Sequence, residues 1–304
     1  MVEEVHIFEN EAGKPGQLQV KSRSDVDHVR RSNAMALTRT LARLTKKQPL
    51  HAMIGQMWNF SMPIQVLESI RREGIRVVNI SMDDRHSFLG WRLADGRWSG
   101  TCGLMGGLDL ACTAAPECVP WYEIGRTPAL YLPEASDPDL FRVDSSPKLY
   151  DVCFVGARYG VRERMVGALQ KEGITVQAYG DGWARGRLPT DSIPRLFAQS
   201  KIVLGCGTIL HCEDFYALKM RDFDGPMSGS LYMTHDNPDL YELFVPNREI
   251  VLFRKLPEMI AKVKYYLGHD EEREQIARAG QVRAARDHTW QQRFQALMTK
   301  LELL

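Results

Sequence analysis

The second half of the chain alternates short apolar runs with longer stretches in which apolar residues recur every three or four positions. Short apolar runs are typical of strands buried in a parallel sheet, and the longer pattern is typical of helices with one apolar face. Met165, Val166 and Leu169, for example, share one face of a helix predicted over residues 162–171. The alternation indicates βα units around a parallel sheet. The predicted strands are Tyr150–Val155, Ile174–Tyr179, Lys201–Leu204, Ser230–Thr234 and Glu249–Phe253, and the further helices are Leu256–Leu267, Glu271–Arg286 and one from about Trp290.

The first half is less regular but carries the same kinds of element. Its predicted helices are Arg30–Leu44 and Ile64–Glu73, and its predicted strands are Leu50–Ile54, Arg76–Ile80, Leu108–Thr113 and Ala129–Leu132. Residues 83–107 are rich in Gly, Trp, Arg and Asp and are predicted to form a loop. The polar, proline-containing stretch Asp137–Lys148 separates the halves, so we expect two α/β domains, 1–145 and 146–304.

Composition and charge exclude several classes of protein. A chain of 304 residues with 44% hydrophobic and 25% charged residues is globular rather than disordered. Its net charge of +1 favours neither a nucleic-acid partner nor a membrane surface. No apolar run approaches the roughly 20 residues that span a bilayer, and the acidic start does not resemble a signal peptide, so we expect a cytoplasmic protein. The cysteines form no CxxC pair; buried thiols are the favoured interpretation, and a zinc site of Cys102, Cys112 and Cys118 is the alternative.

Two glycine-bearing segments follow predicted strands, where ligands of such sheets bind. The first, Gly156-Ala157-Arg158-Tyr159-Gly160, leads into a helix that carries Arg162 and Arg164. Glycine lets a ligand approach the backbone, and arginine offers paired donors to phosphate. The second is Gly180-Asp181-Gly182-Trp183, which suits a flat ring or a close backbone contact. The alternatives are a plain turn with solvated arginines in the first segment, and a turn capped by Trp183 in the second.

A third segment, residues 219–229, places Lys219, Arg221 and Asp224 just before the strand Ser230–Thr234. A carboxylate can accept hydrogen bonds from both hydroxyls of a ribose, while cations balance the charge of a diphosphate. The alternative is an exposed charged helix that ends at Gly225-Pro226.

Over roughly 155 residues the second half resembles the CgeB-like (spore-maturation protein-like) glycosyltransferases, a branch of the retaining GT-B enzymes. The resemblance rests on motifs that occur in the family's order. These are Tyr150-Asp151-Val152-Cys153-Phe154-Val155-Gly156, Tyr179-Gly180-Asp181-Gly182-Trp183, Lys219-Met220-Arg221-Asp222-Phe223-Asp224, Glu242-Leu243-Phe244, Lys264-Tyr265-Tyr266-Leu267, Ala279-Gly280, His288-Thr289-Trp290 and Arg293.

The resemblance implies a GT-B fold, in which two Rossmann-like domains with parallel sheets face a central cleft and the C-terminal domain binds a nucleotide sugar. By position, Asp224 would hold the ribose, and Lys219 and Arg221 would lie near the diphosphate with Gly229 in the turn behind them. Gly156, Arg158, Gly180, Gly182 and Trp183 would complete this site. Asp224 replaces the family's usual glutamate, and Tyr216 stands where many relatives carry another acidic residue.

In the first half, Asn79-Ile80-Ser81-Met82-Asp83-Asp84-Arg85-His86 resembles the family's Asp-Asp segment near the cleft. Asp84 or His86 could position an acceptor hydroxyl if it lies within about 3 Å of it. The alternatives are a turn or N-cap role for the aspartates and a solvent-facing loop position for His86.

Together these features predict a hexosyltransferase-like glycosyltransferase that moves a sugar from a nucleoside-diphosphate sugar to an unknown acceptor. Catalytic charge would come from Arg221 and Lys219, with retention of configuration and with neither metal nor cofactor, as the resemblance implies. A nucleotide-sugar epimerase or hydrolase and a non-catalytic nucleotide-sugar-binding protein remain alternatives. A nicotinamide-dependent oxidoreductase is disfavoured because no GxGxxG follows an early strand.

Overall fold

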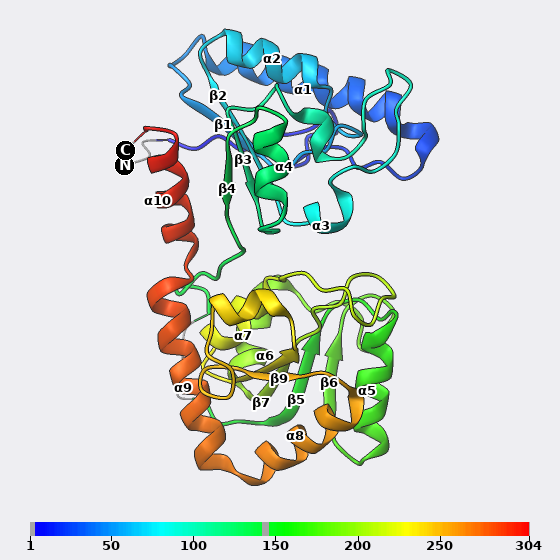
Figure 1. The fold of residues 1–304 in the computed structure, drawn as a ribbon, viewed down its shortest axis with the longest axis vertical. Helices are drawn as coiled ribbons and strands as arrows, with labels where there is room; N and C mark the ends of the chain where they lie inside the picture. Colours follow the sequence, from blue (N-terminus) through cyan, green and yellow to red (C-terminus); the bar gives the residue numbers. More distant parts are fainter. Residues whose placement is uncertain (1–3, 142–145, 304) are drawn as a thin grey trace. The chain divides into compact units, whose positions relative to one another are not determined.

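The computed structural model describes residues 4–141 and 146–303, and the statements below concern those residues. The chain divides into two compact units (Figure 1). Unit 1 comprises Met1–Pro133 and Gln295–Leu304, and unit 2 comprises Glu134–Phe294. The border expected between residues 145 and 146 falls at the end of the stretch 142–145, which lies outside the described residues.

Unit 1 is built on a parallel sheet with the strand order β1-β2-β3-β4. Neighbouring residues of β2 point to opposite faces of this sheet, so Val77 and Val78 enter two different cores. Helices α1, α2 and α4 pack on the face of Val77, whereas Leu297 and Leu301 pack on the face of Val78. The elements are α1 (Val26–Leu44), β1 (Ala52–Gly55), α2 (Ile64–Arg72), β2 (Arg76–Ser81), α3 (Asp84–Ser87), β3 (Leu110–Thr113), α4 (Cys118–Ile124), β4 (Ala129–Tyr131) and the end of α10 (Trp290–Lys300).

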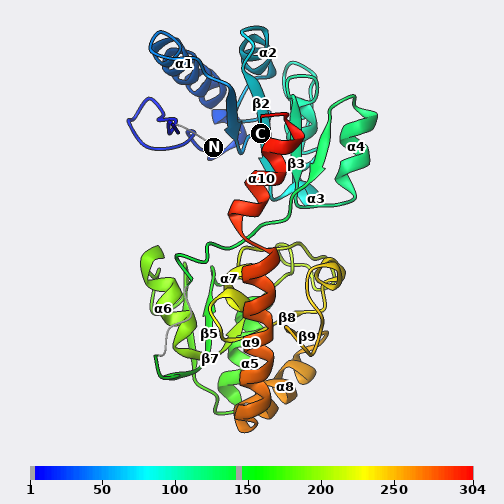
Figure 2. The same ribbon diagram turned by 90° about the vertical axis from the view of Figure 1, so that its left-hand side faces the viewer.

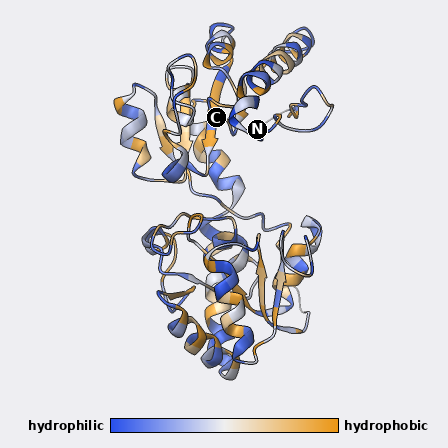
Figure 3. Ribbon diagram, turned by 90° about the vertical axis from the view of Figure 1, so that its right-hand side faces the viewer, coloured by the Kyte–Doolittle hydropathy of each residue, from blue (hydrophilic) through white to orange (hydrophobic). Residues whose placement is uncertain are grey.

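Unit 2 holds a second parallel sheet, with the order β6-β5-β7-β8-β9. Within β5, Val152 and Phe154 face α5 and α8, while Cys153 faces α6 and α7, so helices cover both faces. Figure 2 shows the same ribbon from the side of α9, and in Figure 3 the strands of both units carry mainly hydrophobic colours. The elements are β5 (Tyr150–Val155), α5 (Val161–Lys171), β6 (Val176–Tyr179), α6 (Ile193–Ala198), β7 (Ser200–Leu204), α7 (Arg221–Met227), β8 (Leu231–His235), β9 (Val251–Phe253), α8 (Leu256–Gly268) and α9 (Asp270–Asp287).

The predicted strands are confirmed to within two residues at each end, and the predicted helices to within four. Helices α3, α4, α6 and α7 were not among the predicted helices, and α3 lies in the stretch predicted to be a loop. The clearest case is α7, which is not the exposed charged helix considered above, because residues 222–227 are all buried. Its packing on β8 is so close that a Cβ on Gly225 would lie 2.2 Å from Cδ2 of Tyr232. Among the described helices, none combines the length and the apolar character needed to cross a bilayer.

Candidate functional site

The candidate site of unit 2 lies where β5 and β7 end. Gly156 follows β5, and Gly205 and Cys206 follow β7. In the order β6-β5-β7-β8-β9, the chain leaves β5 to form β6 on one side of it and then returns to form β7 on the other side. The strand order therefore reverses at β5. Ligands of open α/β sheets bind beyond the carboxyl ends of the strands at such a switch point.

Three of the predicted site residues build the turn at this edge. Gly180 follows β6, and a Cβ there would lie 2.4 Å from the carbonyl oxygen of Gly156. With φ at +132°, Gly180 also has a backbone conformation that favours glycine. The indole Nε1 of Trp183 donates to the same carbonyl oxygen at 2.7 Å. Gly180 and Trp183 therefore hold the strand-end loops together, which agrees with the turn considered as an alternative for this segment.

Arg221, the first residue of α7, places a positively charged guanidinium group at this edge of the sheet. Its guanidinium lies 5.4 Å from the ring centre of Phe154, and its Nη1 would be 3.2 Å from a Cβ on Gly156. Its Nε and Nη2 are buried and have no hydrogen-bond partner in the described chain. A buried donor that stays unpaired costs about 1–3 kcal/mol, and more on a charged group. This guanidinium is therefore suited to an anion beside Gly156.

Asp224, three residues further along α7, is buried beside Arg221. Burial raises the pKa of its carboxyl group to about 7, although the Ser136 hydroxyl and the Arg221 charge oppose the shift. Asp224 is only 8% exposed, so its carboxyl group has little contact with water. Asp224 can therefore change its protonation state near neutral pH, which the sequence did not indicate.

The neighbouring segment is held in place by Asp222, which is fully buried. Its Oδ2 accepts the backbone N–H of Lys219 at 2.7 Å, and its Oδ1 accepts the hydroxyl of Tyr232 at 2.6 Å. Burial raises the pKa of Asp222, and both hydrogen bonds oppose the shift. Asp222 therefore ties Lys219 and the start of α7 to β8, which fixes the backbone that carries Arg221.

Arg158 and Gly182 lie on the same edge, but the side chain of Arg158 is already engaged. Its guanidinium pairs with the Glu163 carboxylate, lies 3.5 Å from the Gly182 carbonyl oxygen and stacks over Trp183. Nearly half of this side chain is exposed, so binding a phosphate would require it to leave Glu163. The structure thus favours Arg221 over Arg158 as the residue that meets an anion.

Four further residues lie near this edge, of which the sequence pattern had indicated only Arg162, as an arginine of the helix that follows Gly156. Arg162, His235 and Asn237 are buried, and each has a side-chain nitrogen without a partner among the described residues: Nε, Nδ1 and Nδ2 respectively. The fourth is Cys206, whose Sγ lies 3.3 Å from the Thr208 hydroxyl. Cys206, His235 and Asn237 lie at or within two residues of the carboxyl ends of β7 and β8, so the rule that singled out Gly156 would have found them, whereas Arg162 is the second residue of α5.

The Cys206 thiol has an unusual electrostatic environment. Burial acts to raise its pKa, but the His235 imidazole, the Thr208 hydroxyl and the charge of Arg162 together bring the pKa down to about 6. Of the six cysteines, the other four buried ones lie within the two sheets, the helices or their connections, and only Cys212 is exposed. In the described residues, no cluster of three His, Cys, Asp or Glu side chains is arranged to hold a metal ion.

In unit 1 the environment of Asp84 argues against the acceptor-positioning role expected for it. The residue is 1% exposed, and its carboxylate accepts hydrogen bonds from Ser81 at 2.7 Å, Thr101 at 2.5 Å and Tyr122 at 2.9 Å. Burial raises the pKa of Asp84, and these donors oppose the shift. With its oxygens occupied inside the core, Asp84 holds the β2 end, α4 and the loop at Thr101 together. His86, at the exposed side of α3, keeps the solvent-facing position considered as its alternative.

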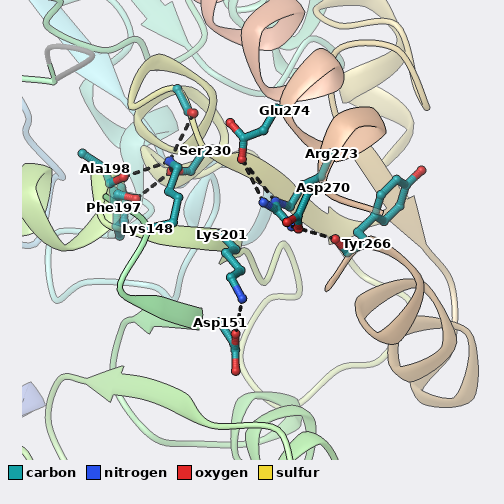
Figure 4. Close-up of polar contacts among 11 residues, drawn as sticks. Lys148, Asp151, Phe197, Ala198, Lys201, Ser230, Tyr266, Asp270, Arg273 and Glu274 are labelled. Atoms are coloured by element: carbon teal, nitrogen blue, oxygen red, sulfur yellow. Dashed lines mark hydrogen bonds and ion pairs between the residues drawn. The ribbon is translucent and has the colours of Figure 1, made fainter. Parts of the chain in front are cut away.

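Gly229 is the other predicted site residue that the structure places elsewhere. It follows the C-terminal end of α7 and precedes β8, at the amino edge of the sheet. Its carbonyl oxygen lies 3.4 Å from Nζ of Lys148, which also reaches the Ala198 carbonyl oxygen and the Ser230 hydroxyl (Figure 4). A helix rises about 1.5 Å per residue, so α7 separates Gly229 from Arg221 by roughly 10 Å. Gly229 and Arg221 therefore lie at opposite ends of α7.

The sequence from Arg162 onward matches a described protein family, the glycosyl transferase-like family, over residues 162–299. These residues make up somewhat less than half of the chain, so the match is a similarity of this segment. The matched range contains the Arg162, Cys206, Arg221, Asp224 and His235 side chains described above. No curated protein matches the chain.

Solved structures show the same fold as the two units described here. Sucrose-phosphate synthase of Thermosynechococcus elongatus matches with a TM-score of 0.67 at 10% identity, over 99% of this chain and 86% of that one. HepE of Anabaena in complex with UDP-glucose matches with a TM-score of 0.63 at 11% identity, over 90% and 82%. A glycosyltransferase of Rickettsia africae ESF-5 matches with a TM-score of 0.61 at 9% identity, over 93% and 83%. The predicted fold class is confirmed: two sheets of parallel strands that match GT-B glycosyltransferases.

Proposed function

We propose that this protein is a glycosyltransferase that takes a sugar from a nucleoside-diphosphate sugar and transfers it to an acceptor hydroxyl. The observation that carries the proposal is the Arg221 guanidinium, which is half-buried at the switch point of unit 2 with unpaired donors beside Gly156. A diphosphate would satisfy those donors and neutralise the charge. The family match over residues 162–299 and the UDP-glucose complex of HepE support the same ligand class.

In this proposal Arg221 acts on the leaving group. When the bond between the sugar and the diphosphate breaks, negative charge grows on the diphosphate, and a fixed cation stabilises it most in that state. Lys219, held at the start of α7 through Asp222, would add a second positive charge. Charge from these side chains supports transfer without a metal, and retention of configuration and a CgeB-like substrate range belong to the same proposal.

Asp224 would receive the ribose hydroxyls. Its position next to Arg221 on α7 places a carboxyl group and a cation within one helical turn, as a nucleoside diphosphate requires. The hydroxyls donate to the carboxylate, so the ionised form is the one that binds. The acceptor side of the reaction has no comparable support, because Asp84 is occupied within unit 1.

A thermal-shift panel of UDP, GDP and dTDP tests the proposal. A nucleotide at about 100 times its Kd stabilises the folded state by about 2.7 kcal/mol, which raises the melting temperature measurably. Arg221→Ala is expected to abolish this shift, while Arg195→Ala, which removes an exposed arginine of α6, is expected to leave it unchanged. The proposal fails if Arg221→Ala keeps the full shift or if no nucleotide stabilises the wild-type protein.

One observation favours a second candidate, a nucleotide-sugar-binding protein without turnover. Tyr216 stands where many relatives have an acidic residue, and its hydroxyl donates to the backbone carbonyl of Glu213 at 3.1 Å. A tyrosine offers no carboxylate to the transferred sugar. Release of free nucleotide from the sugar donor, followed with and without candidate acceptors, separates the two: binding with no release at any acceptor favours the second candidate.

A further inference from the structure

Unit 1 contains a cavity of about 320 Å³ that the proposed reaction does not use. It lies at the amino ends of β2, β3 and β4, since its lining includes the first residues of β2 and β3 and the residue before β4. Four cationic side chains from four separate segments line it: Arg71 of α2, Arg76 of β2, Arg126 after α4 and Lys300 at the end of α10.

The charges around this cavity do not balance. Four cations face two carboxylates, those of Asp109 and Glu302, which leaves an excess of two positive charges. Asp109 already has several partners: its Oδ2 accepts the N–H of Val77 at 2.8 Å, and its Oδ1 lies 3.1 Å from Nε of Arg71 and 3.8 Å from Nη1 of Arg76. Arg71 in turn donates to the Gly106 carbonyl oxygen at 2.7 Å. The single carboxylate of Asp109 is thus shared by Arg71 and Arg76, and in the described part of the chain it forms no ion pair with Arg126 or Lys300.

Arg126, which lines this cavity, has a strained backbone conformation. Its φ is +56°, in the left-handed region where glycine is favoured and most other residues are strained. The turn is fixed on both sides, because the N–H of Arg126 donates to Glu123 O at 2.9 Å and the N–H of Thr127 to Tyr122 O at 2.9 Å. Non-glycine residues held in strained conformations occur preferentially at functional sites. A glycine would suit this turn better, so the turn by itself gives no reason for an arginine at this position.

We propose that this cavity is a second binding site, which takes the phosphate or diphosphate group of a small phosphorylated molecule. An excess of two positive charges matches a phosphate dianion, and guanidinium groups offer paired donors to its oxygens. The volume is at the lower end for ligand sites, which limits the ligand to a small molecule. Because Lys300 belongs to the C-terminal segment and Arg126 to the sheet connections, the ligand would join these two parts of unit 1.

The experiment measures stabilisation by pyrophosphate in an Arg221→Ala background, so that the proposed site of unit 2 does not contribute. Pyrophosphate is expected to raise the melting temperature, and sodium chloride at equal ionic strength is expected to do so much less. Arg126→Gly is the decisive variant, because relief of the backbone strain should raise the melting temperature without ligand while the pyrophosphate shift is lost. Lys300→Ala should reduce the shift.

Matched controls use exposed cations of unit 1 that lie away from the cavity. Arg43→Ala and Lys47→Ala should leave the pyrophosphate shift intact. The proposal is overturned if Arg126→Gly keeps the full shift, if these controls lose it as strongly as Arg126→Gly does, or if malonate, a dicarboxylate dianion, stabilises as well as pyrophosphate. Because nucleotide binding at Arg221 is tested in the parent protein, its failure would leave this result unaffected.

Discussion

Replacing Asp224 with asparagine should change how the stability of the protein depends on pH. The folded state raises the pKa of this carboxyl group from the 3.8 of an ordinary aspartate to about 7, mainly because the group is buried. Asparagine has nearly the same shape and carries no proton that titrates in this range. The difference in unfolding free energy between Asp224→Asn and wild type therefore isolates the protonation of one residue.

The sign follows from which state holds the proton. Between about pH 4 and pH 7 the folded chain keeps a proton on Asp224 that the unfolded chain has released. The stability that protonated Asp224 contributes is therefore fully present below about pH 4 and is lost as the pH rises through about 7. A pKa difference of one corresponds to about 1.36 kcal/mol, so the rise from 3.8 to about 7 gives roughly 4 kcal/mol. Between pH 4 and pH 8, the unfolding free energy of Asp224→Asn should therefore rise relative to that of the wild type by up to this amount.

Urea unfolding of both proteins at pH 4.5, 5.5, 6.5, 7.5 and 8.5 measures this difference. The comparison is necessary because other groups titrate in the same range with opposite sign, so the wild-type profile alone would not show it. Two parallel profiles, with a constant difference from pH 4.5 to 8.5, would refute the assignment of a raised pKa to Asp224.

The same protonation connects stability to the proposed function. If the ionised carboxylate accepts the ribose hydroxyls, nucleotide binding requires loss of the proton. The affinity for UDP should then fall by up to about tenfold for each pH unit below 7 and level off above it. Calorimetric titrations at pH 6, 7 and 8 measure this dependence, and an affinity that stays constant would remove Asp224 from the ribose site.

Three further predictions concern single side chains. Burial lowers the pKa of His288 to about 4, so the stability that its neutral form provides is lost as the pH falls from 6.5 through 4. In urea unfolding, His288→Asn should remove this loss of unfolding free energy at acid pH, which amounts to up to about 3 kcal/mol. Gly180→Ala would place a Cβ 2.4 Å from a backbone oxygen and should lower the urea midpoint, whereas Gly167→Ala, which meets nothing within 4 Å in α5, should raise it slightly. Tyr122→Phe leaves one oxygen of buried Asp84 without its donor and should cost about 1–3 kcal/mol in the same assay, with an unchanged midpoint counting against the network.

Local patterns were sufficient to predict the elements of both sheets. The run Tyr150–Val155 coincides with β5, because a strand covered by helices on both faces must be apolar at successive positions whatever packs on it. The same holds for the amphipathic helices α5 and α8, whose apolar faces recur with the helical period. The strand-end rule then identified the segments at Gly156 and Gly180, because the order of strands and helices along the chain is itself local information. The segment that contains Arg221 and Asp224 was identified instead by its charged and small residues just before the strand Ser230–Thr234.

What the sequence could not determine is the direction and burial of individual polar side chains. Asp84 follows β2 as the strand-end rule requires, yet Tyr122, 38 residues later, takes up one of its oxygens inside the core. Helix α7 contains acidic residues, Gly225 and Pro226, which locally favour a turn, and becomes a helix because it packs on β8. The unpaired donors of Arg221 likewise exist only once the surrounding elements have removed water from them. Periodicity therefore determined which segments form the sheets, and contacts between residues distant along the chain decided which charges are buried, paired or available to a ligand.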